Sequence, residues 1–171
     1  SYPTWRMISK GKQFFKFGRM DVRATLPKGQ GIWPAIWMLG ENIGEVSWPR
    51  CGEIDIMEMI GGQGREKTVH GTIHFDEDGY KSHGGETSLA TGTFADKFHV
   101  FSIEWTEDKI AWFVDDVKFH EEDISGATKD EFRKDFFFIL NVAVGGNWPG
   151  IPSAETSFPQ HMIVDYIRVF Q

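Results

Sequence analysis

The chain has 171 residues with a formal net charge of −7, and 15% of the residues are aromatic. That length suits one domain with a substantial core, so residues 1–171 are treated as a single domain. The dispersed Lys and Arg residues argue against a nucleic-acid partner. No apolar run is long enough to cross a membrane. The single cysteine, Cys51, excludes an internal disulfide.

Alternating residues predict strands in the first part of the chain. A strand pattern begins at Trp5, and a longer one runs from Phe14 to Leu26 with a bend at Gly18. Beyond that bend apolar and polar residues alternate, which is typical of an antiparallel sheet with one open face. Arg19 lies on the polar face, where a solvated surface position is one interpretation.

Two tryptophans mark the next strand, residues 31–39. Trp33 and Trp37 are four residues apart and therefore share a strand face. The pair could fill a core, but indole N–H groups need partners and sugar rings stack on indoles, so a sugar-binding platform is the alternative. The loop that follows, residues 41–50, carries Trp48 as a candidate contact at the rim of a site.

The stretch from Gly52 to Glu58 threads three carboxylates among strand-forming residues. In a regular strand Glu53 and Asp55 would share a face, and Glu58 would point to the other face, which the apolar residues need for the core. A β-bulge near Met57 returns Glu58 to the face of the other two acids. We therefore predict a bulged strand with an apolar underside and three acids on its open side.

This row of acids has a chemical interpretation. Like charges one strand step apart repel each other, which should raise at least one pKa. With the bulge, the α-carbons of Glu53 and Glu58 lie roughly 13 Å apart, and two leaning side chains can bring their carboxyls to the separation of about 5–5.5 Å found in retaining glycosidases. A calcium site and a solvated acidic edge are the alternatives, although a calcium loop needs turn residues and a solvated edge does not need apolar residues between its charges.

Residues 67–75 alternate again and place His70 and His74 on one face. Their separation of roughly 13 Å is too wide for one zinc ion with bonds of about 2 Å. A hairpin with the acidic strand would put His74 beside the carboxylates, where it can hydrogen-bond a carboxylate or a sugar hydroxyl.

The rest of the chain predicts a long polar loop over residues 76–95, in which His83 is expected to be idle, and a short helix over residues 128–134. Five further strands are predicted over residues 98–105, 109–114, 117–120, 136–144 and 162–170. Asn141 interrupts an apolar run and is either a satisfied core amide or a ligand contact, whereas Trp148 lies on a stiff, exposed turn. Many strands separated by turns, with no βαβ alternation, predict an all-β sandwich.

The acidic stretch resembles the catalytic signature of glycoside hydrolase family 16, in the bulged form of the laminarinases. Three further segments are similar to other laminarinase motifs and occur in the same order: Gly31–Leu39, Val69–Phe75 and Gly145–Gly150. The resemblance implies a jelly-roll sandwich of two curved antiparallel sheets, with substrate along a concave cleft. It also implies retaining endo-hydrolysis of β-1,3-glucan of the laminarin type, or of mixed β-1,3-1,4-glucan.

The resemblance assigns roles to individual residues. Glu53 is the expected nucleophile, Glu58 the acid/base, and Asp55 the residue that tunes Glu53. No cofactor is required for this chemistry, Asp165 resembles a position that contributes to a structural calcium site, and the family implies secretion. The residues expected to contact the polysaccharide are Arg19, Trp33, Trp37, Trp48, His74, Asn141 and Trp148.

Members of this family usually have further strands ahead of the segment with which this sequence begins. The resemblance therefore implies a sandwich without its first strands, less stable than a full-length relative, that self-associates or is completed by another chain. Two alternative functions stay open, namely a non-catalytic β-glucan-binding module and the same chemistry on a galactan such as agarose or carrageenan.

Overall fold

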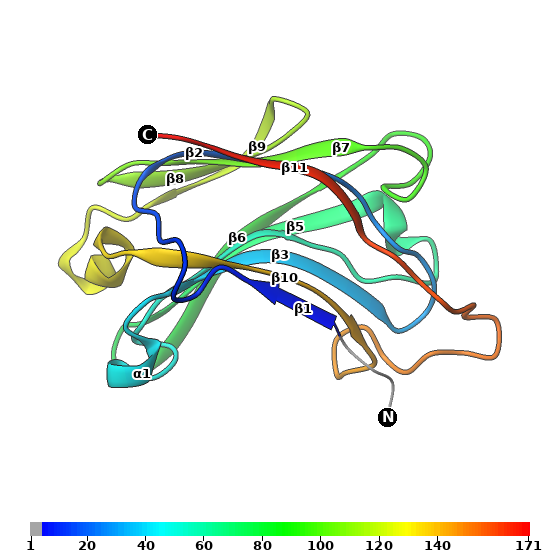
Figure 1. The fold of residues 1–171 in the computed structure, drawn as a ribbon, viewed down its shortest axis with the longest axis horizontal. Helices are drawn as coiled ribbons and strands as arrows, with labels where there is room; N and C mark the ends of the chain where they lie inside the picture. Colours follow the sequence, from blue (N-terminus) through cyan, green and yellow to red (C-terminus); the bar gives the residue numbers. More distant parts are fainter. Residues whose placement is uncertain (1–4) are drawn as a thin grey trace.

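Two antiparallel β-sheets face each other across a hydrophobic core in the computed structural model, which describes residues 5–171 (Figure 1). The six-stranded sheet has the order β1-β10-β3-β4-β5-β6, with bounds Trp5–Ile8, Phe136–Val144, Ile32–Gly40, Glu53–Glu58, Thr68–Asp76 and Tyr80–Ser88. The five-stranded sheet has the order β11-β2-β7-β8-β9, with bounds Ile163–Phe170, Gly18–Thr25, His99–Trp105, Lys109–Val114 and Val117–Asp123. The predicted all-β sandwich is confirmed.

In the described part of the chain, three short helical segments lie in the loops: α1 (Ile43–Val46), η1 (Arg65–Lys67) and η2 (Ala127–Arg133). The helix predicted over residues 128–134 is present as the 3₁₀ segment η2, whereas α1 falls in a stretch predicted to be a loop. Within residues 5–171, no helix has the length and apolar character that a membrane crossing requires.

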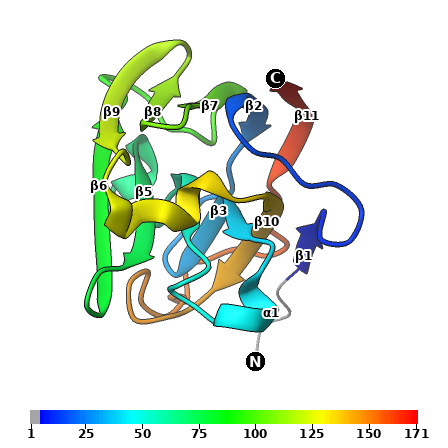
Figure 2. The same ribbon diagram turned by 90° about the vertical axis from the view of Figure 1, so that its left-hand side faces the viewer.

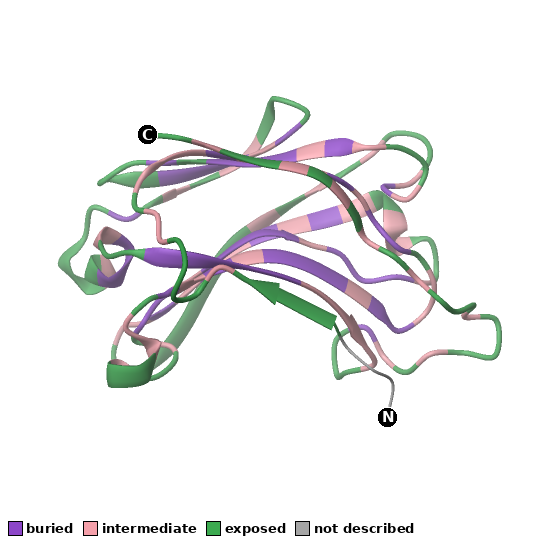
Figure 3. Cartoon of the chain, in the orientation of Figure 1, coloured by how far each residue is buried: buried purple, intermediate pink, exposed green. Residues whose placement is uncertain are grey.

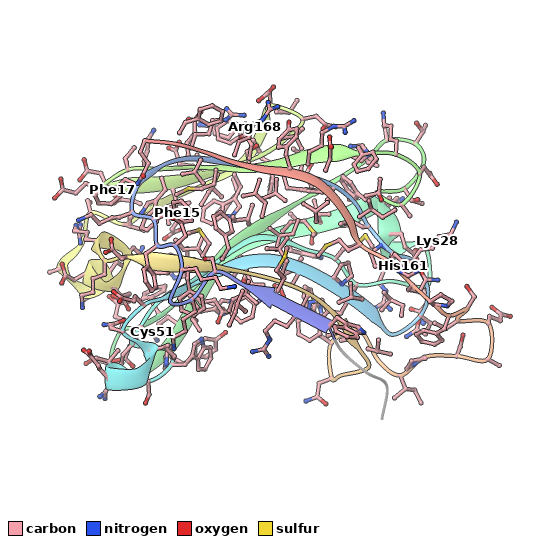
Figure 4. The ribbon with its side chains drawn as sticks, in the orientation of Figure 1. Phe15, Phe17, Lys28, Cys51, His161 and Arg168 are labelled. Atoms are coloured by element: carbon pink, nitrogen blue, oxygen red, sulfur yellow. The ribbon has the colours of Figure 1, made fainter. Side chains whose placement is uncertain are left out.

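Alternation along the strands builds the core from both sheets. On β2, for example, Met20, Val22 and Ala24 are fully buried and the residues between them are half-buried. Side chains fill the space between the two layers, with Phe15 and Phe17 packing against the core from the segment that leads into β2 (Figure 4). Full burial of one large apolar side chain contributes about 1.5–3 kcal/mol, so this shared interior holds the two sheets together.

The first half of β10 is buried on both faces, as its apolar run predicts. Residues 136–140 are all buried, and from Asn141 onward the strand is half-buried. The ring of Phe14 packs edge-on against Phe137, and the Lys10 ammonium lies over the same ring. The segment between β1 and β2 therefore covers one face of β10.

The prediction of a loop over residues 76–95 is wrong for its central part, because Tyr80–Ser88 forms strand β6. Asp78 and Gly79 both have positive φ and make the turn that returns the chain from β5. An Asp-Gly pair between alternating segments is a hairpin signal, so the sequence did contain the evidence for β6. His83 consequently lies on a strand, with Nδ1 2.8 Å from a carboxylate oxygen of Glu122.

The two sides of the sandwich differ. On one side β6 contacts β9 (Figure 2). There the His120 ring lies so close to Gly85 that a Cβ on Gly85 would be 2.8 Å from it. On the other side, strand β1 is exposed along its whole length (Figure 3). A cavity of about 780 Å³ opens on that side between β1, β10 and residues 158–164, and Trp5, which is 84% exposed, lines it.

Candidate active site

The three acids lie on the face of the six-stranded sheet that points away from the core. Opposite them on β5, Glu53 is paired with His74 and Glu58 with His70, and the register shifts between Asp55 and Glu58. Both residues within the shift, Ile56 and Met57, are buried in the core. The predicted bulge is confirmed, and it returns Glu58 to the side of Glu53.

Each of the two glutamates accepts a hydrogen bond from an indole. Trp48 Nε1 donates to Glu53 Oε2 at 3.0 Å, and Trp33 Nε1 donates to Glu58 Oε1 at 3.0 Å. Hydrogen bonds from N–H groups favour the ionised form of a carboxyl. The two tryptophans therefore hold the glutamates in place and oppose the effect of their burial.

Asp55 belongs to a hydrogen-bonded chain that leads to solvent. It is 2% exposed, and its Oδ2 lies 2.8 Å from His74 Nε2. The other ring nitrogen of His74, Nδ1, lies 2.8 Å from the hydroxyl of Tyr80, which is 51% exposed. Asp55 also shares a hydrogen bond with Glu53. His74 thus contacts a carboxylate, which was one of its two predicted roles.

Burial makes all three carboxyls harder to ionise than free acids. Burial, followed by the charge of Asp55, raises the pKa of Glu53 to about 8. Burial raises the pKa of Glu58 to about 7 against the opposing Trp33 hydrogen bond, and burial together with the charge of Glu58 raises the pKa of Asp55 well above its usual range. At neutral pH the three carboxyls therefore carry fewer than three charges, so the site holds at least one proton donor.

Aromatic rings flank the acids at both ends. Beside Glu53, the ring centroids of Trp48 and Tyr80 are 5.0 Å apart, and the His74 ring stacks on Tyr80 at 5.7 Å. Beside Glu58, Trp148 packs edge-on against Trp33 at 5.4 Å and against His70 at 5.1 Å. Partly exposed aromatic rings of this kind are suited to stacking against sugars.

The other two predicted contacts lie next to this row. Trp37 is paired with Asp55 across β3 and β4, and its Nε1 donates to Asn141 Oδ1 at 2.7 Å. Asn141 is half-buried. Trp37 is thus placed beside the acids, while the Asn141 amide oxygen is already satisfied by an indole.

The expectation that Arg19 contacts substrate is wrong. Arg19 is on β2, in the other sheet, where the neighbouring Met20 faces the core and Arg19 faces outward. Its guanidinium pairs with Asp21, Glu104 and Asp116. The full thickness of the sandwich separates it from the acids.

The expected calcium site at Asp165 is not supported by its surroundings. Asp165 Oδ2 accepts a hydrogen bond from the Arg23 guanidinium at 2.6 Å, so a cation already occupies this carboxylate. Within residues 5–171, one group of three potential ligands stands close together, Glu53, Asp55 and His74, whose ligand atoms lie within 4.8 Å of one another. Their hydrogen bonds to one another account for that proximity, and calcium binding stays a prediction.

Sequence reasoning missed Tyr80 and did not assign His70. The loop predicted over residues 76–95 excludes Tyr80 from a strand face, whereas the Asp78-Gly79 turn is the sequence signal that reveals its strand. His70 shares the face of His74, and its pairing opposite Glu58 follows from the hairpin register. The separation of about 5–6 Å expected between the two Glu carboxyls also stays a prediction.

Comparisons with known proteins agree with this geometry. The model of "Glycosyl hydrolases family 16" matches residues 6–168. The chain is 39% identical to a β-glucanase of Rhodothermus marinus and 36% identical to a β-1,3-glucan-binding protein of Penaeus monodon, with 99% and 85% of this chain aligned. It spans 63% and 47% of the length of those two relatives.

Among solved structures, the chain is similar to the catalytic domain of an endo-1,3-β-glucanase (laminarinase) from Thermotoga petrophila. The TM-score is 0.88 and the identity 48%, with 97% of this chain and 68% of that chain covered. One of the two sequence relatives above is a β-glucanase and the other is a β-1,3-glucan-binding protein. Sequence similarity alone therefore does not distinguish catalysis from binding, and the site residues decide between them.

The raised pKa values predict that the site costs stability at alkaline pH. Because the pKa of Glu53 is about 8 in the folded protein and 4.5 is its ordinary value, folded protein retains a proton that unfolded protein loses. The contribution of Glu53 to the free energy of unfolding is therefore fully present below about pH 4.5. It falls as the pH rises toward 8, by about 1.4 kcal/mol per pH unit. Glu53→Gln should raise Tm by several degrees at pH 8, since 1 kcal/mol corresponds to about 2–4 °C in a domain of this size, and should change little at pH 4.

Calorimetry or circular dichroism at the two pH values measures this difference. Glu121→Gln is the matched control, because hydrogen bonds from Lys118 and Lys109 lower the pKa of Glu121 and removing its charge should give no gain. Equal Tm values for Glu53→Gln and the parent protein at pH 8 would contradict the prediction.

Proposed function

Because this chain belongs to glycosyl hydrolase family 16, we propose that it is an endo-acting glycoside hydrolase that cleaves β-1,3-glucan with retention of configuration. The observation that carries the proposal is the arrangement of Glu53, Asp55 and Glu58 on one face of a bulged strand. A binding surface gains nothing from three buried carboxyls with raised pKa values, whereas acid/base catalysis requires them.

The roles follow from the geometry and the charges. Glu53 attacks the anomeric carbon and forms a glycosyl-enzyme bond while Glu58 gives its proton to the leaving oxygen. Glu58 then removes a proton from the water that hydrolyses the intermediate. A pKa of about 7 suits this exchange, because Glu58 then holds its proton in the free enzyme at mildly acidic pH and regains it easily.

Asp55 makes the attack by Glu53 feasible. The two carboxyls share a hydrogen bond, which raises the pKa of Glu53 and lowers that of Asp55. Attack therefore requires that the shared proton passes from Glu53 to Asp55. Asp55 is the more deeply buried of the two, so its neutral form is the more favoured by burial. As charge leaves Glu53 during attack, His74 keeps Asp55 oriented through the 2.8 Å contact.

The two aromatic clusters support a polysaccharide substrate that passes over both ends of β4. Trp48 and Tyr80 would hold sugar beside Glu53, and Trp33 and Trp148 would hold sugar beside Glu58. Contacts on both sides of the acids favour cleavage within a chain over removal of terminal residues. The similarity to a laminarinase supports β-1,3-glucan as the polymer.

The proposal is tested by incubating the protein with laminarin, lichenan, agarose and carrageenan and sizing the products. We expect oligosaccharides of mixed length from laminarin, with less from lichenan. Products from agarose or carrageenan alone would show that the polymer is a galactan, and binding of laminarin without products would show a binding module.

The assignment of the two glutamates predicts different behaviour of their variants. Glu53→Ala should abolish turnover because no covalent intermediate forms. Glu58→Ala on an activated aryl glycoside should be slow and rescued by azide, which needs no base, attacks the glycosyl-enzyme in place of water, releases Glu53 and gives a glycosyl azide of retained configuration. Normal activity of Glu53→Ala, or an azide product of inverted configuration from Glu58→Ala, would reverse or refute the assignment.

The hydrogen bond from Trp33 predicts a change in the pH profile. Trp33→Phe removes an N–H that favours the ionised form of Glu58, so the pKa of Glu58 should rise above about 7. Because Glu58 must be protonated in the free enzyme, the alkaline limb of kcat/KM should move to higher pH. Trp37→Phe is the control, since that indole donates to Asn141 and should leave the limb in place.

We also propose that the exposed side of the sandwich pairs with a second copy of this chain. Edge strand β1 exposes Trp5 and Met7, β11 exposes Ile163 and Phe170, and the apolar cavity lies between these strands. Unpaired edge strands with apolar side chains are templates for association.

Sedimentation over a range of concentrations should therefore show a reversible dimer. Trp5→Ser should weaken the dimer, whereas Val117→Ser should not. Val117 is also an exposed apolar residue, but it lies at the start of β9, on the other side of the sandwich (Figure 2). A monomer at every concentration would contradict this proposal.

A further inference from the structure

Trp112 reaches across the core from the five-stranded sheet to the strand that carries the acids. It is on β8 and fully buried. Its Nε1 donates a hydrogen bond of 2.8 Å to the backbone carbonyl of Asp55. The two sheets of a sandwich normally meet through apolar side chains, so this polar contact between a side chain of one sheet and the backbone of the other needs an explanation.

The bulge supplies that explanation. Asp55 is the last residue in register with β5 before the shift, and regular pairing resumes at Glu58. The ladder of hydrogen bonds is locally disrupted at a bulge, and a buried carbonyl without a partner is costly. The Trp112 indole provides a donor at the point where the strand leaves its regular path.

Two glycines, one on β5 and one on β6, leave room for the Trp112 indole and for the ring beside it. Gly71 lies between the β5 partners of Asp55 and Glu58, and a Cβ on Gly71 would lie 2.3 Å from Trp112 Cδ1. Gly71 is paired with Gly85, and Trp112 is paired with His120. A Cβ on Gly85 would likewise lie 2.8 Å from the His120 ring. Two paired glycines thus receive two paired rings directly behind the bulge.

We propose that Trp112 is a positioning residue that fixes the bulge through the Asp55 carbonyl and thereby sets Glu58 relative to Glu53. The expected effect on kinetics rests on the proposed function, whereas the effect on the positions of the two carboxyls does not. Trp112 itself lies behind the sheet and contacts no substrate.

Trp112→Phe keeps an aromatic ring and removes the N–H donor. Trp105→Phe is the matched control, because Trp105 is also buried and its Nε1 donates to the Phe132 carbonyl at 3.0 Å, at η2 and away from the bulge. Both variants lose one buried indole hydrogen bond and should lose similar thermal stability. We expect kcat on laminarin to fall about 10- to 100-fold for Trp112→Phe, as for a small misplacement of reacting groups, with KM within about twofold and Trp105→Phe close to the parent protein.

Carboxyl ¹³C NMR titration provides a readout that does not depend on turnover. The titration midpoints of Glu53 and Glu58 should move in Trp112→Phe and stay in Trp105→Phe. If the parent protein cleaves no glycan, the proposed function fails and the titration still decides this inference. Should Trp112→Phe not fold, site-specific incorporation of benzothienylalanine at position 112 removes the N–H with almost no change in shape. Equal kinetics and equal titrations for the two substitutions would overturn the inference.

Discussion

A single strand must present three carboxyls to one side while three apolar side chains stay in the core, and the structure depends on how β4 meets that constraint. A regular strand cannot do so, because alternation would direct Glu58 inward. The extra residue between Asp55 and Glu58 solves the geometric problem and creates an energetic one, because a bulge disrupts the ladder of hydrogen bonds beside it. At that point Trp112 donates a hydrogen bond to the Asp55 carbonyl, and Gly71 leaves the space for its ring.

The charges impose a second constraint on the same strand. Burial raises the pKa of each acid, and mutual repulsion adds to the effect. The indoles of Trp48 and Trp33 counteract it from opposite ends. These two residues also belong to the aromatic clusters, so the groups that restrain the carboxyls are the groups that would contact sugar. Binding and acid/base chemistry are therefore coupled through two N–H groups.

The sequence predicted correctly those parts of the site that depend on the residues of a single strand, and it failed where contacts between strands decide. The bulge followed from the residues of β4 alone, since only a shift makes both the acids and the apolar residues consistent. Arg19 was misplaced because alternation tells which residues share a face but not which sheet the strand joins. Trp112 carries no signal at all in the sequence, because a core tryptophan and one that holds a backbone carbonyl have the same neighbours along the chain.

The chain of contacts from Asp55 through His74 to Tyr80 has a kinetic consequence. A carboxyl that is 2% exposed would ordinarily exchange its proton with water only when the surrounding structure opens. Here an imidazole touches Asp55 with one nitrogen and the exposed phenol with the other. Exchange of the two ring tautomers passes a proton along this line while the heavy atoms stay in place. The proton of Asp55 can therefore exchange with water through His74 and Tyr80 without local unfolding of the strands around it.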